Sequence, residues 1–188
     1  MSVRVRYAPS PTGSPHVGNI RTALFCHLFA QRHGGVMFVR IEDTDRSRAV
    51  EGCEEEILGS LAWMGIEWAE GPDKGGPVGP YRQTERHAAG LYEAPIAHLL
   101  DSGHAYRAFD TPEELTAMRE AQAASKAAQG YFGGVWRDAS PEEVQAALDA
   151  GKPYVIRLRM PTDRKLVVHD AIRGAIEWEP GLAEDAVL

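Results

Sequence analysis

The chain has 188 residues, 44% of them hydrophobic and 25% charged, which suits a globular protein of one large or two small domains. No apolar run approaches the roughly 20 residues of a membrane span, and the start has no secretion-signal pattern. We therefore expect a cytoplasmic protein without membrane contact. The net charge of -7, taken by itself, argues against nucleic-acid binding, because phosphate contacts need Lys and Arg.

The charges are distributed unevenly along the chain. Residues 1–50 carry seven basic and three acidic side chains, residues 51–110 carry four and eleven, and residues 111–188 carry nine and thirteen. The first fifty residues are thus net positive within an acidic protein. We expect anionic ligands to be drawn to this segment.

The N-terminal segment has the pattern of a strand, a loop, a helix and a second strand. Residues 3–7 alternate as a short strand does, and the Pro and Gly residues that follow end it. Residues 17–32 have the apolar stripe of a helix packed on a sheet, carried by Ile20, Leu24 and Leu28. Residues 36–41 form an apolar run typical of a buried parallel strand. This order predicts the right-handed crossover that opens a doubly wound α/β sheet.

The loop between the first strand and the helix has the composition of a phosphate-binding loop. A helix that starts after His16 presents free N–H groups and the positive end of its dipole beyond the strand. Small residues such as Gly13 and Gly18 let a ligand approach the backbone, and His16 offers a donor to an anion. The alternative is a Pro-rich turn with a solvated histidine, which is the better interpretation of a Pro-Ser-Pro sequence alone.

The wider pattern resembles glutamyl-tRNA synthetases, which are class I aminoacyl-tRNA synthetases. Residues 9–18 resemble the His-Ile-Gly-His signature region in the form used by that family, with Asn19 in place of the second His. Three further blocks follow in the order of the family: residues 40–48, 79–83 and 105–109. By contrast, residues 131–137 depart from the Tyr-Asp-Gly-Arg that the family usually has, so no contacts are carried over there.

The resemblance implies the N-terminal portion of such an enzyme. Residues 1–81 correspond to the first half of a Rossmann-type nucleotide-binding catalytic domain with parallel strands. Residues 82–188 correspond to an α+β insert that binds the tRNA acceptor end. The boundary falls after the loop 71–80, in which seven of ten residues are Gly or Pro.

The resemblance also implies roles for individual residues. The catalytic pair, which stabilises charge on the phosphates, is His16 and Gly18. Residues that bind glutamate are Arg6, Ala8, Ser10 and Glu42, with Arg6 on a carboxylate and Glu42 on the amino group. Residues that bind ATP are Pro9, Thr12, Gly13, His16, Gly18 and Asn19. Contacts to tRNA are assigned to Asp45, Arg48, Arg107 and Arg157.

The implied activity is that of a glutamate-tRNA ligase, which forms glutamyl adenylate from ATP and glutamate and transfers the glutamyl group to the 3' end of tRNA(Glu). ATP is expected with Mg²⁺, and the protein is expected to be a monomer. Cys26 and Cys53 fall in separate predicted helices and the histidines are scattered, so we expect no zinc and no protein metal site.

Three alternatives compete with this interpretation. A paralogue that glutamylates a modified tRNA nucleoside typically carries a Cys-rich zinc cluster in the insert, whereas no Cys follows position 53. A catalytically silent tRNA-binding module would be favoured if the complete gene stopped at Leu188, because the Lys-Met-Ser-Lys-Ser signature is absent from the 188 residues. A generic nucleotide-binding domain leaves residues 40–48 unexplained.

The acidic cluster after the second strand and the basic residues of the strand at residues 154–159 can each be explained by structure as well as by ligand binding. The acidic cluster at Glu42, Asp43 and Asp45 suits a helix cap, a metal site or an ammonium group. The alternation that places Arg157 and Arg159 on one face suits a phosphate backbone, although a solvated outer face is commoner.

The remaining elements follow from periodicity and from turn residues. Helices are predicted at residues 51–64, at about 84–101 with a kink at Pro95, from 112 onward, and at 141–150. The Ala-rich stretch 117–128 is either a continuation of the third helix or a partly ordered arm. Strands are predicted at residues 105–109, 154–159, 166–169 and 175–178, the last three as one small antiparallel sheet.

We predict that the 188-residue chain alone does not charge tRNA. Class I chemistry draws phosphate contacts from the His16 loop and from a Lys-containing signature, and only the first is present. Removing one preorganised donor commonly costs about a hundredfold in rate. The measurement is glutamyl-tRNA formation from ATP, glutamate and tRNA(Glu); a rate near that of a complete synthetase contradicts the prediction.

Overall fold

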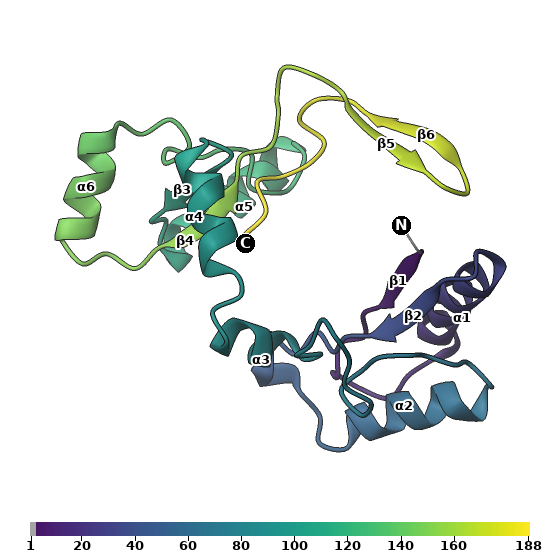
Figure 1. The fold of residues 1–188 in the computed structure, drawn as a ribbon. Helices are drawn as coiled ribbons and strands as arrows, with labels where there is room; N and C mark the ends of the chain where they lie inside the picture. The colour runs from purple at the N-terminus through teal and green to yellow at the C-terminus, as the bar shows by residue number, and fades with distance from the viewer. Residues whose placement is uncertain (1–2) are drawn as a thin grey trace. The chain divides into compact units, whose positions relative to one another are not determined.

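The computed structural model describes residues 3–188, which divide into two compact units, Met1–Tyr92 and Glu93–Leu188 (Figure 1). The first unit contains β1 (Arg4–Tyr7), α1 (Val17–Arg32), β2 (Val36–Val39), the short 3-10 helix η1 (Arg46–Arg48), α2 (Cys53–Trp63) and α3 (Gln83–Ala88). The second contains α4 (Glu93–Asp101), β3 (Ala105–Ala108), α5 (Pro112–Ser125), α6 (Pro141–Asp149), β4 (Val155–Leu158), β5 (Leu166–Asp170) and β6 (Gly174–Trp178). In this described part, no helix combines the length and hydropathy of a membrane span.

The first unit is built on a parallel sheet. β1 pairs in parallel with β2, with Arg4 opposite Val36 and Tyr7 opposite Val39, and α1 packs on both strands (Figure 1). The predicted α/β crossover is therefore confirmed. The other edge of β2 is extended by residues 69–70 and 81–83, which also run parallel to it.

The Gly- and Pro-rich loop 71–80 leaves this edge of the sheet and returns to it. The Val39 N–H donates to the Glu70 carbonyl before the loop, and the Ile41 N–H donates to the Tyr81 carbonyl after it, both at 2.9 Å. The loop thus belongs to the first unit. The predicted boundary between residues 81 and 82 lies within that unit, and the assignment of residues 82–188 to tRNA binding stays a prediction.

The buried face of α1 differs from the predicted stripe. The helix buries Ala23, His27 and Ala30, whereas the expected Leu24 and Leu28 are 37% and 50% exposed. The helix has apolar side chains on more than one face, so periodicity alone is ambiguous. Ile20 of the predicted stripe is partly buried and does pack against the core. In α2, helical spacing places Cys53, Ile57, Leu61 and Met64 on one face; the first three are buried, whereas Met64, just after the helix, is 46% exposed.

The single helix expected at about residues 84–101 is wrong. Two helices, α3 and α4, are separated at Gly90, whose positive φ of 68° suits glycine. Pro95 does not kink the second helix, because it lies in the first turn of α4, where a backbone N–H has no partner within the helix.

The expected three-stranded sheet near the C-terminus is also wrong. β4 pairs with β3 in an antiparallel manner, while β5 and β6 form a separate hairpin that extends from the rest of the unit (Figure 1). The other side of β4 is covered by the last residues of the chain: the Leu158 N–H donates to the Ala186 carbonyl at 2.8 Å, and the Leu188 N–H to the Ile156 carbonyl at 2.9 Å. Alternation predicts that these segments are strands, but it does not predict which strands pair.

Asp185 anchors this C-terminal segment to the core of the second unit. Its side chain is 1% exposed and accepts hydrogen bonds from Arg137 at 2.7 Å, Tyr106 at 2.6 Å and the Met160 N–H at 2.9 Å. Burial, and second the bond to Asp185, raise the pKa of Tyr106 above its usual 10.0. The carboxylate is thus buried but well satisfied, which is the condition under which a buried charge is tolerated.

We predict that Asp185→Asn lowers the free energy of unfolding of the second unit by about 3 kcal/mol, because it leaves the nearly buried Arg137 without its counter-ion. Urea denaturation measures the change. The matched control is Asp138→Asn: Asp138 is 84% exposed and pairs with Arg159 at 3.1 Å, so its loss costs about 0.5 kcal/mol or less. Equal effects of the two variants contradict the prediction.

In the first unit, Glu70 ties β1 to the loop 71–80. The Glu70 carboxylate is buried and accepts hydrogen bonds from Arg4, at 2.8 Å, and from the Tyr81 hydroxyl. The Val78 N–H in turn donates to the Tyr81 hydroxyl at 3.3 Å. The Arg4 bond, followed by the Tyr81 bond, lowers the pKa of Glu70 below its usual 4.5.

We predict that Glu70→Gln destabilises the first unit at neutral pH and that this difference shrinks on acidification. A carboxyl with a lowered pKa in the folded state contributes stability that is present above pH 4.5 and is lost as the pH falls through the folded pKa. Thermal unfolding from neutral to acidic pH measures the gap between parent and variant. Glu67→Gln, at an exposed position, serves as the control, and a gap that is constant with pH contradicts the prediction.

Candidate functional site

The loop between β1 and α1 is held in one conformation by contacts along its length. The Glu42 N–H donates to the Pro9 carbonyl at 2.9 Å, and the Val50 N–H donates to the Pro11 carbonyl at 3.0 Å. The Cys53 thiol donates to the Gly13 carbonyl at 3.0 Å. Segments that follow β2 thus fix the loop from the side. Both cysteines are free, Cys53 being buried and Cys26 half-buried.

His16 is the N-cap of α1. Its Nδ1 accepts the Gly18 N–H at 3.1 Å, and the Asn19 side chain accepts the His16 N–H at 3.1 Å, which completes a capping box. Because Nδ1 acts as an acceptor, the proton of the neutral ring sits on Nε2. The exposed ring therefore offers an N–H donor at the positive end of a 16-residue helix.

A pocket of about 220 Å³ lies against this loop. Its lining includes all residues predicted to bind ATP except Gly18. The lining residues are Tyr7, Pro9, Ser10, Thr12, Gly13, Ser14, Pro15, His16, Asn19 and Ile57. Gly18 lies at the helix start beside His16. The pocket is of a kind that binds anions, because its walls are backbone and small polar side chains at a helix N-terminus.

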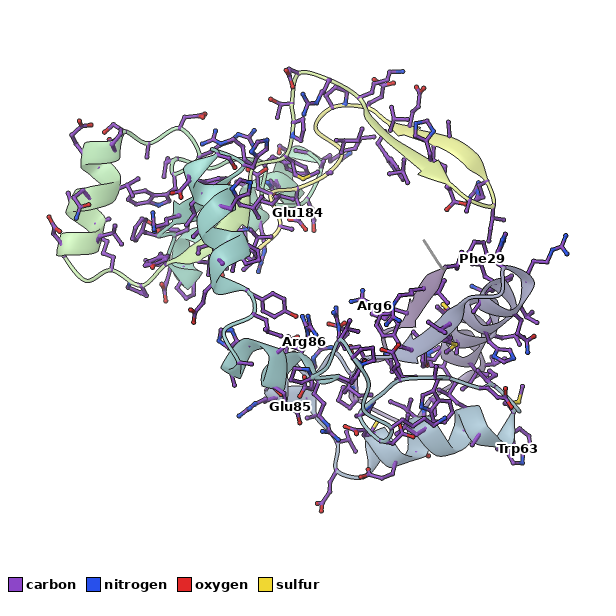
Figure 2. All side chains as sticks on the ribbon, in the orientation of Figure 1. Arg6, Phe29, Trp63, Glu85, Arg86 and Glu184 are labelled. Carbon is purple, nitrogen blue, oxygen red and sulfur yellow. The ribbon has the colours of Figure 1, made fainter. Side chains whose placement is uncertain are left out.

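The predicted glutamate residues meet at the carboxyl ends of the two strands. Arg6, at the end of β1 (Figure 2), places Nη1 3.3 Å from Oε1 of Glu42, which follows β2. Arg40 donates to the same oxygen from Nε at 3.2 Å and from Nη2 at 3.1 Å. The structure thus brings Arg6 and Glu42 together, with a second guanidinium beside them. Ala8 is exposed in the loop that continues from β1.

The acidic cluster separates into different roles. Glu42 faces the arginines, whereas Asp43 accepts the backbone N–H of Thr84 at 2.9 Å and also its hydroxyl, and so caps α3 from a distance in the sequence. Asp45 accepts from Ser47 and Arg48, and both bonds lower its pKa. Within residues 3–188, no three His, Cys, Asp or Glu side chains are grouped as metal ligands.

The four residues assigned to tRNA lie in different environments. Asp45 and Arg48 pair with each other at 2.6 Å on the surface of the first unit. Arg107 is half-buried in the second unit, 5.7 Å from the centre of the Tyr154 ring. Arg157 is only 8% exposed: it lies over Tyr131 at 3.6 Å and donates to the Asp185 carbonyl. Because its guanidinium is buried and already contacts Tyr131 and Asp185, Arg157 is poorly placed to bind a phosphate.

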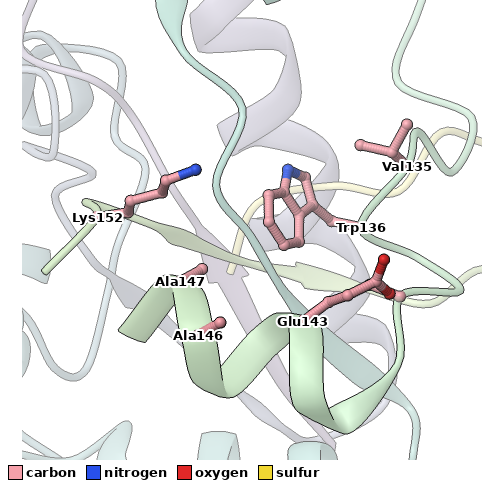
Figure 3. Close-up of a pocket in the computed structure, with 7 residues that line it drawn as sticks. Val135, Trp136, Glu143, Ala146, Ala147 and Lys152 are labelled. Atoms are coloured by element: carbon pink, nitrogen blue, oxygen red, sulfur yellow. The ribbon is translucent and has the colours of Figure 1, made fainter. Parts of the chain in front are cut away.

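A second, larger pocket lies in the other unit and contains none of the predicted site residues. It has a volume of about 340 Å³ and is lined by Val135, Trp136, Ala139, Glu143, Ala146, Ala147 and Lys152 (Figure 3). Glu143 is already used there to cap α6. This surface offers no group of reactive or anion-binding side chains comparable with the loop of the first unit.

Sequence reasoning missed Arg40 and Asp185 as structurally important residues. Arg40 lies within a motif block, and its position two residues before Glu42 predicts that both side chains leave the same face of an extended strand. That signal was available. No local pattern marks Asp185, because its partners Arg137 and Tyr106 are 48 and 79 residues away in the sequence.

We predict that Gly18→Ala turns the His16 ring away from α1 without unfolding the protein. A Cβ at position 18 lies 2.8 Å from Cε1 of His16, and the ring is free to move because it is exposed. The displaced ring loses the bond to Nδ1, so its share of the Nε2-protonated form falls toward that of a free neutral histidine. Long-range ¹H–¹⁵N spectra of the neutral imidazole measure this share. Gly59→Ala, where a Cβ meets nothing within 4 Å, is the control, and unchanged His16 signals in Gly18→Ala contradict the prediction.

Comparisons with known proteins identify the family of the chain. The family model of the catalytic domain of class I tRNA synthetases (E and Q) matches residues 2–188. The chain is 50% identical to a glutamate-tRNA ligase 2 of Rubrobacter xylanophilus over 99% of its length, and 51% identical to a glutamate-tRNA ligase of Geobacillus thermodenitrificans over 95%. It covers 37% and 36% of these relatives, so the chain spans little more than a third of their length.

Two solved structures are also similar. The glutamate-tRNA synthetase of Elizabethkingia anophelis matches the whole chain with a TM-score of 0.89 and 43% identity, and the chain covers 39% of it. A glutamate-tRNA ligase from Elizabethkingia meningosepticum, in complex with its amino acid, matches with a TM-score of 0.87 and 43% identity, and the chain covers 38% of it. The chain therefore belongs to the class I tRNA synthetases of the E and Q group, and the matched region is the catalytic domain of that family.

Proposed function

We propose that this chain provides the glutamate and ATP sites of a glutamate-tRNA ligase. The observation that carries the proposal is the meeting of Arg6 and Glu42 at the carboxyl ends of two parallel strands, beside a capped helix N-terminus with an adjoining pocket. Ligands of open α/β sheets bind at this edge. The relatives are glutamate-tRNA ligases, which supplies the reaction, and the charges of the site fit its substrates.

Glutamate is bound through its charges. Arg6 receives the side-chain carboxylate, since a guanidinium matches that group in shape and is permanently charged. Glu42 receives the ammonium group through its second oxygen, and Ala8 and Ser10 adjoin the amino acid. Glutamine lacks the carboxylate that Arg6 selects, so glutamate is preferred.

ATP is bound at the loop. Pro9, Thr12, Gly13 and Asn19 line its pocket, and the Nε2–H of His16 and the helix start at Gly18 stabilise charge on the phosphates. This role is electrostatic and requires no proton transfer from His16. Mg²⁺ arrives with the triphosphate, because it commonly binds through phosphate oxygens and water with only one or two protein carboxylates.

The reaction has two steps. A carboxylate oxygen of glutamate attacks the α-phosphorus of ATP, and pyrophosphate leaves. A hydroxyl of the terminal ribose of tRNA then attacks the acyl carbon, and AMP leaves. No side chain of this chain forms a covalent bond in either step.

The tRNA is the third substrate. Arg48, held by Asp45, and Arg107 remain candidate contacts, with residues 82–188 as the part that receives the acceptor end. Arg157 is omitted because its guanidinium is buried. We further propose a monomer in the cytoplasm, and the two free cysteines are compatible with a reducing compartment.

We predict that Arg6→Ala weakens glutamate binding by about 1.5 to 3 kcal/mol, because it removes one charge-assisted pair. Titration of the chain with glutamate, followed by NMR, measures the affinity. Arg32→Ala is the control, since Arg32 is exposed at the opposite end of α1. Equal glutamate affinity of Arg6→Ala and the parent, or a parent that prefers glutamine, contradicts the proposal.

A further inference from the structure

Two arginines contact the same carboxylate oxygen of Glu42, and one of them binds it more strongly than the other. Arg40 makes two hydrogen bonds to Oε1, from Nε at 3.2 Å and from Nη2 at 3.1 Å. Arg6 makes an ion pair to the same atom at 3.3 Å, but no hydrogen bond of its side chain is found anywhere in residues 3–188. The contact with Arg6 is therefore the weaker of the two, because hydrogen-bond alignment adds to charge attraction.

Arg40 is also less exposed to solvent than Arg6. The side chain of Arg40 is 18% exposed and that of Arg6 is 40% exposed. The backbones of Arg40 and Glu42 are both held against the first strand and its loop, through bonds to the carbonyls of Tyr7 and Pro9. Arg40 and Glu42 thus form a fixed pair, whereas Arg6 is freer to move.

We propose that Arg40 is a positioning residue that holds Glu42, so that Arg6 can exchange the Glu42 carboxylate for that of the substrate. The inference rests on the proposed function, in which glutamate binds here. When Arg6 turns to the substrate, Glu42 keeps a counter-ion in Arg40 and avoids the cost of an unpaired, partly buried charge. Its second oxygen makes no hydrogen bond to residues 3–188 and remains available to the substrate ammonium.

Loss of Arg40 has a specific consequence under this proposal. Among residues 3–188, Glu42 is then left with Arg6 as its one cationic partner, so the pair between them tightens. A ligand carboxylate must then break that pair to reach Arg6. Arg40→Met therefore weakens carboxylate binding although Arg40 itself does not touch the ligand.

Glutarate tests this step in isolation, because it has both carboxylates of glutamate but no amino group to engage Glu42. We expect Arg40→Met to weaken glutarate binding to the full chain about tenfold, the loss that follows from roughly 1.4 kcal/mol. Glu42→Gln removes the competing charge, so in the Arg40→Met background it restores glutarate binding. In the parent background the same change has a much smaller effect. The non-additivity of this double-mutant cycle is the signature of the exchange.

Arg32→Met controls for the loss of one positive charge and should bind glutarate as the parent does. A merely structural role for Arg40 predicts no rescue by Glu42→Gln, and additive effects overturn the inference. The ¹⁵Nε signals of the parent protein supply a second test that needs no variant: glutamate should shift the signal of Arg6 and leave that of Arg40 in place. A shift of Arg40 without one of Arg6 overturns the inference.

Failure of the inference is distinct from failure of the proposed function. A parent chain that binds glutamate and loses it in Arg6→Ala, but is indifferent to Arg40→Met, overturns the role of Arg40 and leaves the proposed function standing. A parent chain that binds neither glutamate nor glutarate at millimolar concentration overturns both.

Discussion

The parallel pairing of β1 with β2 is the constraint on which the candidate site depends. In a parallel pair, both strands end at the same edge of the sheet, and the crossover through α1 places a helix N-terminus at that edge as well. Arg6 and Glu42 are far apart in the sequence, and only this pairing brings their side chains within 3.3 Å. An antiparallel arrangement of the same two strands would place them at opposite ends.

The candidate site is preorganised because its loop and Glu42 are held in place by contacts to this sheet and to the segments beside it. The loop is fixed by backbone bonds at Pro9 and Pro11 and by the capping box at His16. Glu42 is held from one side by Arg40. Donors that are already in place need little reorganisation when a charged ligand arrives, which is how binding and electrostatic catalysis gain from a rigid frame. The Nε2 edge of the exposed His16 ring and the side chain of Arg6 are accessible to a ligand.

In the second unit, buried charged residues make structural contacts within the protein. Asp185 is removed from water and must be satisfied by protein groups, so it recruits Arg137, Tyr106 and a backbone N–H. Arg157 is drawn inward by the Asp185 carbonyl and by the face of Tyr131. A basic residue that alternates with apolar ones in a strand is therefore weak evidence for contact with nucleic acid, even in a family whose members bind tRNA.

The sequence by itself determined the order and type of most elements, and it pointed to the loop around His16 as the candidate site, because both depend on local properties. Alternation, helical spacing and turn residues act within a few positions, and the short motif around His16 is contiguous. Where Gly or Pro interrupts a helical pattern, the outcome depends on its position in the helix: Gly90 ends one helix, whereas Pro95 lies in the first turn of the next and leaves it intact. Only the tertiary structure decided which face of α1 is buried, because that helix has apolar side chains on several faces and the face packed on the strands includes His27 as well as Ala23 and Ala30. It also decided the partners of charged groups, such as Asp43 with Thr84, 41 residues away, and Asp185 with Arg137, 48 residues away. Such contacts arise from packing between distant segments, and no local pattern in the chain encodes them.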